Sequence, residues 1–555
     1  MQGEIFVAGN QGAQPNLARE RAVYQQIRAS GFNREEVFNL YANPLTTTRA
    51  PFTFDEREQY LRLRERFKDN TLLADLTGSY DFGGVELTSV TSYIDREILV
   101  SRDASALTGS VSDDLGFPDS GVLLNSNLRD RTDLKTWTQE LRLGSAGSGP
   151  FQWVVGGFYS DVERIYAQRL PTPGYDAFTD AALGAGTSAA LANGFPANSP
   201  YNADLPYDIK QKAVFGEVSY DFGQVALTAG ARYFDFDEKR DFISGGVFSN
   251  SDRRIADKTS SNGFNPRLIA TFEPNNNLKF NVQAAKGFRL GGVNDPLNLP
   301  LCSDADEAIF EPFAGGFDDE TLWNYEAGAK YSKGPISFNA AVFHTKIKDL
   351  QVTLDAGTCS SRIVFNVPKA HTTGVEMEFG LSPFTGLDLS VAGSYVSAEF
   401  DSTLPGTLAE TTGIREGNRL PSVPKFQIAA TATYGQRFGD TSNWYVSGSV
   451  QHVGSRYTQP ADQERNPRTF TYGNNFGGIP TGLGTTLDLK LPAYTLVNLS
   501  AGLEFDDGLD LILYANNIFD ESPQLSFDRE RGGRARLGFN IGQPRTIGVT
   551  VRKTF

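Results

Sequence analysis

The chain has 555 residues, and 66 acidic residues outnumber 51 basic ones, which gives a formal net charge of −15. Such an acidic chain lacks the basic surface that displaces the counterions of nucleic acids, so we expect no nucleic-acid partner. Two cysteines and three histidines are too few for a disulfide scaffold or a cluster of soft metal ligands, so we expect neither a metal site nor a cofactor.

The composition favours a large β protein over a helical membrane protein. The chain holds 40 Phe, 21 Tyr and 56 Gly, and its mean hydropathy is −0.33. No run reaches the roughly 20 apolar residues that a transmembrane helix needs. The longest apolar stretch among the first 21 residues is Ile5–Ala8, and no basic region precedes it. We therefore expect residues 1–21 to be an irregular segment without a signal peptide.

From Ala22–Ser30 onward, apolar and polar residues alternate with a period of two in many segments. Clear examples are Val225–Tyr233, Leu387–Tyr395, Trp444–Gln451 and Val497–Phe505. Alternation over about ten residues is typical of a tilted strand with one face in lipid and the other in water.

The connections between these predicted strands alternate between short turns and long loops. Eight are short and rich in Gly, Asn, Asp and Pro: 82–84, 144–150, 221–223, 274–277, 332–335, 382–386, 438–443 and 506–508. Nine loops lie between them: 29–70, 103–136, 171–208, 245–261, 292–320, 355–361, 402–424, 460–493 and 527–542. This pattern predicts 18 strands, with the short turns at the periplasmic rim of an outer-membrane barrel. The alternative is a soluble β protein such as a propeller, but no blade repeat is present.

The last strand carries a second membrane signal. Ile547, Val549, Val551 and the terminal Phe555 lie on one face of an alternating segment, although Lys553 interrupts that face. Such a strand is similar to the signal read by the outer-membrane insertion machinery, which we therefore expect as a partner. An ordinary terminal strand is the alternative.

Several segments, in this order and on this strand map, resemble the barrel domain of TonB-dependent receptors, the active transporters of the Gram-negative outer membrane. They are Gln139–Leu143 with Phe151–Tyr159, Leu227–Tyr233, Asn265–Arg267 with Lys286–Arg289, Glu320–Lys330, Asn366 with Ala370 and Gly374–Glu376, and Asn516–Asp520. The resemblance implies an all-β, antiparallel transmembrane β-barrel over residues 22–555, in contact with outer-membrane lipid. It also implies uptake of a scarce ligand, first of all a ferric siderophore, energised by the TonB–ExbB–ExbD complex.

The sequence departs from the family pattern at its N-terminus. Members carry a signal peptide, a TonB-engaging segment and a plug before a barrel of about 22 strands. Here we expect about 18 strands and no plug, and we interpret the chain as an N-terminally truncated receptor. A passive porin-like channel and a non-functional fragment are the alternatives. No Walker loop, GxSxG elbow or HExxH motif is present, so we expect no enzymatic activity.

The last long loop contains the candidate ligand-binding residues. They are four arginines, Arg529, Arg531, Arg534 and Arg536. Their guanidinium groups could bind an anionic ligand through paired hydrogen bonds. Asp528 and Glu530 lie beside them, so a salt-bridged, rigid loop is the alternative reading.

The two cysteines form the other candidate pair. Cys302 and Cys359 fall in consecutive external loops, with two predicted strands between them. Free thiols on a cell surface are a liability, and that compartment permits disulfides. We therefore predict a Cys302–Cys359 disulfide that stiffens the two loops.

Overall fold

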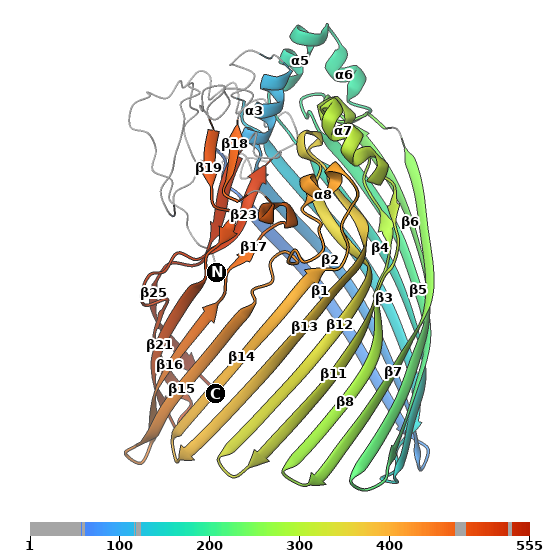
Figure 1. Ribbon diagram of the computed structural model, residues 1–555. Helices are drawn as coiled ribbons and strands as arrows, with labels where there is room; N and C mark the ends of the chain where they lie inside the picture. Colours follow the sequence, from blue (N-terminus) through green and yellow to red (C-terminus); the bar gives the residue numbers. More distant parts are fainter. Residues whose placement is uncertain are drawn as a thin grey trace.

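The structure is a computed structural model that describes residues 57, 61–115, 117, 124–252, 254–464, 466–471, 484–530 and 536–554. Its main element is one curved antiparallel sheet of 17 described strands, in which each strand pairs with the next strand of the sheet along the chain (Figure 1). The strands are β1 (Arg66–Asp81), β2 (Val85–Asp103), β3 (Asn127–Ser145), β4 (Phe151–Arg169), β5 (Asn202–Asp221), β6 (Val225–Gly245), β7 (Ile255–Asn275), β8 (Leu278–Arg289), β11 (Glu320–Lys333), β12 (Ile336–Asp355), β13 (Arg362–Phe384), β14 (Leu387–Phe400), β15 (Phe426–Phe438), β16 (Ser442–Val453), β21 (Tyr494–Phe505), β22 (Leu509–Asn516) and β25 (Thr546–Lys553).

The sequence predicted an all-β antiparallel fold, and this prediction is confirmed. The predicted strand Ala22–Ser30 and the segment 1–21 lie outside the described residues, as does most of loop 29–70. All eight predicted short turns join consecutive strands at one end of the sheet, which is the lower end in Figure 1. In the first of them, Gly83 and Gly84 have φ angles of 87° and 120°, which only glycine adopts without strain.

The long connections lie at the opposite end of the sheet, where they form short helices and small ladders (Figure 1). The helices are α3 (Ser105–Asp114), α5 (Tyr175–Leu183), α6 (Thr187–Leu191), α7 (Asp304–Phe310) and α8 (Thr407–Thr412). The ladders pair β9 (Gly292–Val293) with β10 (Gly316–Phe317), β17 (Arg456–Tyr457) with β20 (Lys490–Leu491), β18 (Arg468–Thr471) with β19 (Gly484–Leu487), and β23 (Gln524–Glu530) with β24 (Arg536–Ile541). None of the helices in the described part of the chain is long and apolar enough to cross a membrane.

Many strands are longer than the sequence predicted. β3, β5 and β7 have 19, 20 and 21 residues, whereas a tilted membrane strand needs about ten. The ladder continues beyond the apolar band because backbone pairing does not require apolar side chains. On β6 the outward positions change from Leu227 and Tyr233 to Asp235 and Asp237, and Asp237 pairs with Lys258 of β7. The start of β7, including Lys258, falls in the predicted loop 245–261, so that loop ends too late, as do the predicted loops 103–136 and 171–208.

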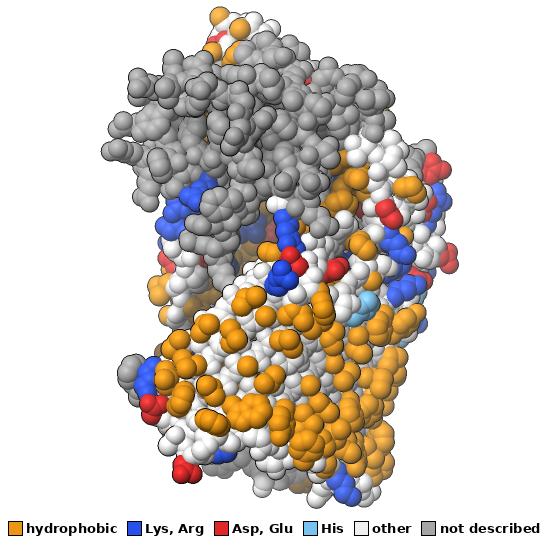
Figure 2. Space-filling model, turned by 90° about the vertical axis from the view of Figure 1, so that its left-hand side faces the viewer, with side chains coloured by type: hydrophobic (Ala, Val, Ile, Leu, Met, Phe, Trp, Pro, Cys, Tyr) orange, Lys and Arg blue, Asp and Glu red, His pale blue; other side chains and the backbone are white. Residues whose placement is uncertain are grey.

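The two faces of the sheet differ in chemistry. Outward residues such as Leu227, Val391 and Val551 are 49%, 39% and 64% exposed, and hydrophobic side chains cover the lower part of the surface shown in Figure 2. The residues between them point to the concave face, where Glu217 and Arg267 form an ion pair. The alternation therefore produces an apolar outer band and a polar inner face, as a membrane barrel requires.

Five glycines on the inner face lie directly opposite aromatic residues of the neighbouring strand. The pairs are Gly156 with Phe215, Gly263 with Phe234, Gly374 with Phe343, Gly502 with Tyr445, and Gly548 with Tyr514. In each pair, a Cβ built on the glycine would collide with the ring. The aromatic ring thus covers the glycine and fills the place of the missing side chain.

We predict that Gly156→Ala destabilises the protein by roughly 1–3 kcal/mol, because overpacking forces neighbouring groups to move. A Cβ there would lie 2.6 Å from the Phe215 ring and 2.8 Å from the Leu141 carbonyl oxygen. Gly157→Ala is the matched control, since its Cβ would have its nearest neighbour at 3.9 Å. Urea unfolding of the detergent-solubilised protein measures both, and equal midpoints for the two variants would contradict the packing argument.

Candidate ligand-binding site

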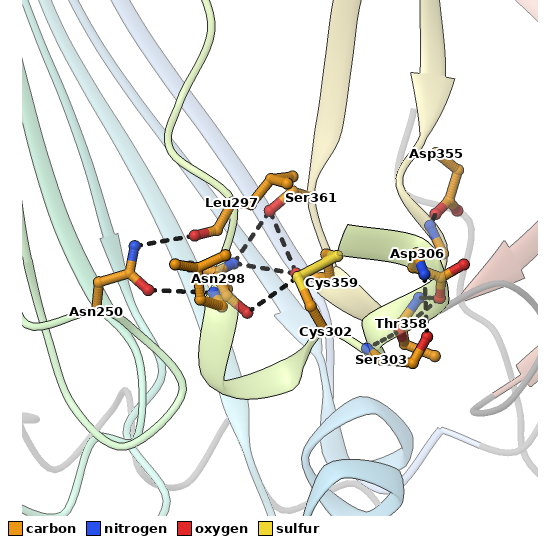
Figure 3. Close-up of a disulfide and its surroundings, with 12 residues drawn as sticks. Asn250, Leu297, Asn298, Cys302, Ser303, Asp306, Asp355, Thr358, Cys359 and Ser361 are labelled. Carbon is orange, nitrogen blue, oxygen red and sulfur yellow. Dashed lines mark hydrogen bonds between the residues drawn. A yellow bond between two sulfur atoms is a disulfide. The ribbon is translucent and has the colours of Figure 1, made fainter. Parts of the chain in front are cut away.

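The loop between β8 and β11 is tied to both neighbouring hairpins (Figure 3). The structure joins Cys302 of this loop to Cys359, at the tip of the β12–β13 hairpin, by a disulfide. Beside it, the Asp306 carboxylate accepts hydrogen bonds from the Thr358 amide, at 2.9 Å, and hydroxyl, at 2.5 Å. On the other side, the Leu299 amide donates to the Asn250 side chain of the β6–β7 loop.

Arg240 anchors the start of the same loop to the inner face of the sheet. Its side chain is 2% exposed and pairs with Asp257 of β7 at 3.3 Å and with Asp295 of the loop at 2.7 Å. It also donates to the carbonyl oxygens of Val293 and Asn294. The loop is therefore fixed at its base by charge and at its tip by covalent bonding, and it forms a stiff rim.

The structure describes the side chain of one of the four predicted arginines, and that side chain is not exposed. Arg529 is buried, and its guanidinium donates to both carboxylate oxygens of buried Asp462, at 2.5 and 2.6 Å. Its partner lies on the β16–β21 connection, not beside it in the sequence. For Arg529, the salt-bridged alternative is the one that matches the structure. Arg531 and Arg534 lie outside the described residues, and of Arg536 only the backbone is described, at the start of β24.

Other charged groups connect the loops near the C-terminal strands. Arg415 pairs with Glu464 at 2.9 Å, and Asn418 donates to the same carboxylate. Arg456 donates to the carbonyl oxygens of Gln524 and Leu525. These contacts connect the β14–β15, β16–β21 and β22–β25 connections into one assembly.

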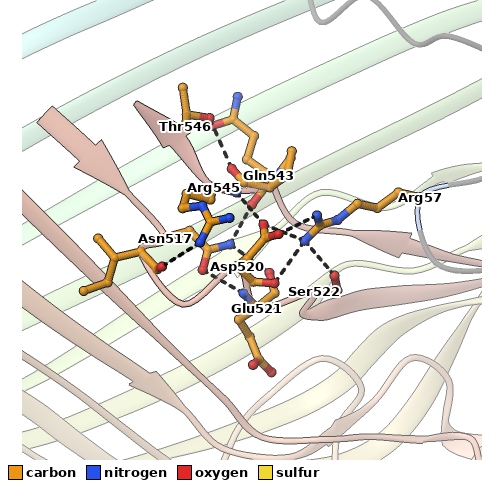
Figure 4. Close-up of polar contacts among 10 residues, drawn as sticks. Arg57, Asn517, Asp520, Glu521, Ser522, Gln543, Arg545 and Thr546 are labelled. Atoms are coloured by element: carbon orange, nitrogen blue, oxygen red, sulfur yellow. Dashed lines mark hydrogen bonds and ion pairs between the residues drawn. The ribbon is translucent and has the colours of Figure 1, made fainter. Parts of the chain in front are cut away.

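The segment Asn516–Asp520 lies at the base of the last connection (Figure 4). Asp520 accepts hydrogen bonds from Arg57 at 3.1 Å and from the Arg545 amide at 2.8 Å. The Arg57 guanidinium and this amide lower the pKa of Asp520 to about 2. Asn517 donates to the carbonyl oxygens of Glu521 and Gln543. Through these contacts the segment fixes the entry into β25.

The inner face below the rim carries two guanidinium groups with aromatic neighbours. Arg164 lies 4.0 Å from the ring centroid of Tyr207, and Arg232 lies 5.2 and 5.8 Å from those of Phe158 and Phe215. Among the described residues no carboxylate forms an ion pair with either arginine, and the Nε atom of Arg164 is buried without a hydrogen-bond partner.

These inward arginines are the strongest candidates for contact with an anionic ligand, because their donors are not used within the described protein. Neither was singled out as a candidate from the sequence. Arg232 already lies at an inward position of the predicted strand Val225–Tyr233, and continuing the alternation of β4 past Phe158 would have placed Arg164 on the same face.

The C-terminal residues of the predicted insertion signal are partly described. Ile547, Val549 and Val551 lie on the outer face of β25 and are 69%, 67% and 64% exposed. Phe555 lies outside the described residues. Recognition of this strand by the insertion machinery stays a prediction.

A family model described as "TonB dependent receptor-like, beta-barrel" matches residues 11–518. The chain therefore belongs to the TonB-dependent receptor family of the outer membrane, as the sequence resemblance predicted. The family and its structural neighbours are transport receptors and not enzymes.

Individual relatives are distant. The pesticin receptor of Yersinia pestis is 24% identical over 445 residues, which are 79% of this chain and 54% of that receptor. The metal-pseudopaline receptor CntO of Pseudomonas aeruginosa is 23% identical over 271 residues, which are 48% of this chain and 31% of that protein. The chain thus spans about half the length of the first of these relatives.

Two solved structures show the same fold. The ferric yersiniabactin uptake receptor FyuA from Yersinia pestis superposes with a TM-score of 0.63 at 16% identity, covering 88% of this chain and 62% of that one. The siderophore receptor PiuA from Acinetobacter baumannii gives 0.61 at 16% identity, covering 91% and 67%.

We predict that Asp462→Ala destabilises the loop assembly by about 3–5 kcal/mol, because it leaves the Arg529 guanidinium buried without a counter-charge. Glu410→Ala is the control, since its contact with Arg415 at 3.9 Å is exposed and should contribute less than about 1 kcal/mol. Hydrogen exchange of β17, β20 and β23 measures the effect, and unchanged protection in Asp462→Ala would show that the ion pair does not hold these loops.

We predict that the isolated protein contains a Cys302–Cys359 disulfide. The bond closes a loop of 57 residues and should stabilise the rim by roughly 4 kcal/mol through chain entropy. Mass spectrometry of a non-reduced digest should find the linked peptide, and limited proteolysis within 290–319 should accelerate after reduction. Two alkylatable thiols without reductant would exclude the bond.

Proposed function

We propose that this protein provides the barrel of an outer-membrane receptor for TonB-energised uptake of a ferric siderophore. Family membership supports the transport class. The relatives point to the ligand class, since they are described as receptors for ferric yersiniabactin, metal-pseudopaline and other siderophores. In this proposal TonB–ExbB–ExbD supplies the energy, and the barrel-insertion machinery places the protein in the membrane as a multi-pass barrel.

At the residue level, the main support is the pair of inward guanidinium groups on Arg164 and Arg232. Both lack an ion-pair partner among the described residues, and both lie against aromatic rings. A guanidinium group binds carboxylate or phenolate oxygens with strong, directed hydrogen bonds, and the adjacent rings offer flat contact to a planar ligand. An anionic iron chelate has both kinds of group.

The arginines of the last loop keep a smaller role in this proposal. Arg529 is a structural residue because its buried guanidinium forms an ion pair with buried Asp462. Arg531, Arg534 and Arg536 remain candidates for the first contact with an anionic ligand outside the membrane.

We predict that Arg164→Gln and Arg232→Gln each weaken binding of an anionic ferric siderophore by about tenfold or more, since a hydrogen bond to a charged group contributes roughly 1.5–3 kcal/mol. Arg142→Gln is the control, because Arg142 lies on the same face but pairs with Glu140 at 3.1 Å. Fluorescence quenching in detergent measures affinity against a panel of ferric chelates.

Binding that is unchanged in both variants would remove these arginines from the proposal. The transport mechanism is tested separately by radioactive iron uptake in cells that produce the protein with and without TonB. Uptake that does not depend on TonB, together with steady conductance in planar bilayers, would favour the porin-like alternative instead.

A further inference from the structure

The apolar band on the outer face contains one large groove. It has a volume of ≈ 1230 Å³, and its lining is mainly apolar, including Leu268, Val282, Val342 and Val375. The groove runs diagonally across β5 to β14, because it follows two consecutive rows of paired residues. His344 lies in its lining on β12, with Thr373 beside it on β13.

Basic residues lie directly beyond this part of the groove. In the next row of the ladder, Trp323 of β11 pairs with Lys286 on one side and with Lys346 on the other, and Lys346 pairs with His371 of β13. In the row beyond that, Lys348 is opposite Lys369. Four lysines and two histidines on β8, β12 and β13 thus face outward at the boundary of the apolar band. We call these six residues, Lys286, His344, Lys346, Lys348, Lys369 and His371, the basic boundary cluster.

The charges of this cluster are only partly neutralised. Lys348 pairs with Asp349 at 3.5 Å, and His371 pairs with Asp401 at 2.7 Å. In the described ranges, no carboxylate forms an ion pair with Lys286, Lys346 or Lys369. Outward lysines on β5 and β7 behave differently, since Lys210 pairs with Asp208 at 3.2 Å and Lys258 with Asp237 at 3.8 Å.

Two aromatic residues lie where the cluster meets the groove. Trp323 and Tyr325 are successive outward residues of β11, their rings are stacked with centroids 6.1 Å apart, and Tyr325 also lines the groove. Trp and Tyr favour the level of lipid headgroups, where one end of the ring is apolar and the other is wet. An apolar groove and a cationic cluster therefore adjoin at an aromatic pair, as the acyl chains and the phosphate groups of a phosphorylated lipid adjoin at its headgroup.

We propose that this face binds a phosphorylated glycolipid of the outer leaflet, with its phosphate groups on Lys286, Lys346 and Lys369 and its acyl chains in the groove. The proposal rests on the proposed outer-membrane location, but it concerns the outer face and not the siderophore site. The lysines without carboxylate partners carry it, because a cation at a membrane surface attracts anionic headgroups whereas a paired one has its charge already balanced.

The test uses the complete 555-residue protein, isolated from outer membranes in detergent, and lipid A as the probe. Lipid A should raise the melting temperature in a saturable manner, whereas its dephosphorylated form and phosphatidylcholine should not. The triple variant K286Q/K346Q/K369Q should bind lipid A at least tenfold more weakly, and the matched control K210Q/K258Q should bind like the wild type. K286R/K346R/K369R keeps the charges and should retain binding.

Equal lipid A affinity of the triple Gln variant and the wild type would overturn the proposal, as would equal binding of dephosphorylated lipid A. Inorganic phosphate that competes at the concentration of lipid A would show that the site is a simple anion site, and it would also overturn the proposal.

Siderophore affinity is measured on the same samples. The triple Gln variant should keep it, and Arg164→Gln should keep lipid A binding, so failure of one proposal is distinguishable from failure of the other.

Discussion

The backbone hydrogen-bond register between neighbouring strands is the constraint on which the rest of this structure depends. A membrane offers no partner for an unpaired amide, so a membrane-crossing β protein must satisfy its backbone groups between strands. Once the register is set, the side-chain period of two decides which face each residue occupies. The apolar outer band, the inward position of Arg164 and the outward row Lys286–Trp323–Lys346–His371 all follow from this single set of pairings.

The connections at the external end of the sheet are held together mainly by side-chain contacts, not by backbone pairing. The external connections have few regular ladders, and they are held by side chains that cross from one loop to another. Arg240 holds the base of the β8–β11 connection, the Cys302–Cys359 bond holds its tip, and Arg529 with Asp462 joins two connections near the C-terminus. Each of these contacts joins residues more than 50 positions apart. The rim is thus a cross-linked assembly on a sheet made of local pairings.

This difference explains how much the sequence could predict. Turns and faces depend on neighbours in the chain, so alternation and turn-forming residues located the eight hairpins and the two faces. Strand ends were predicted poorly at the external end, because β7 begins at Ile255 with residues that also suit a loop. The partner of Arg529 was out of reach, since Asp528 and Glu530 are adjacent in sequence while Asp462 comes close only through the fold. The family could be recognised from the sequence because the segments that resemble it are short and lie on neighbouring strands. Arg289 and Glu320, for example, are opposite each other on β8 and β11.

The five glycine–aromatic pairs have a consequence for assembly. Because the hairpins of this antiparallel sheet are similar to one another, a strand can pair with its neighbour in a register that is displaced along the strand. A shift by one residue exposes the wrong face to lipid, but a shift by two preserves the alternation and is therefore the more dangerous error. At Gly263 and Gly374, such a shift would move a residue with a side chain under the ring of Phe234 or Phe343. The five pairs therefore disfavour a displaced hydrogen-bond register at the junctions between neighbouring hairpins where they lie.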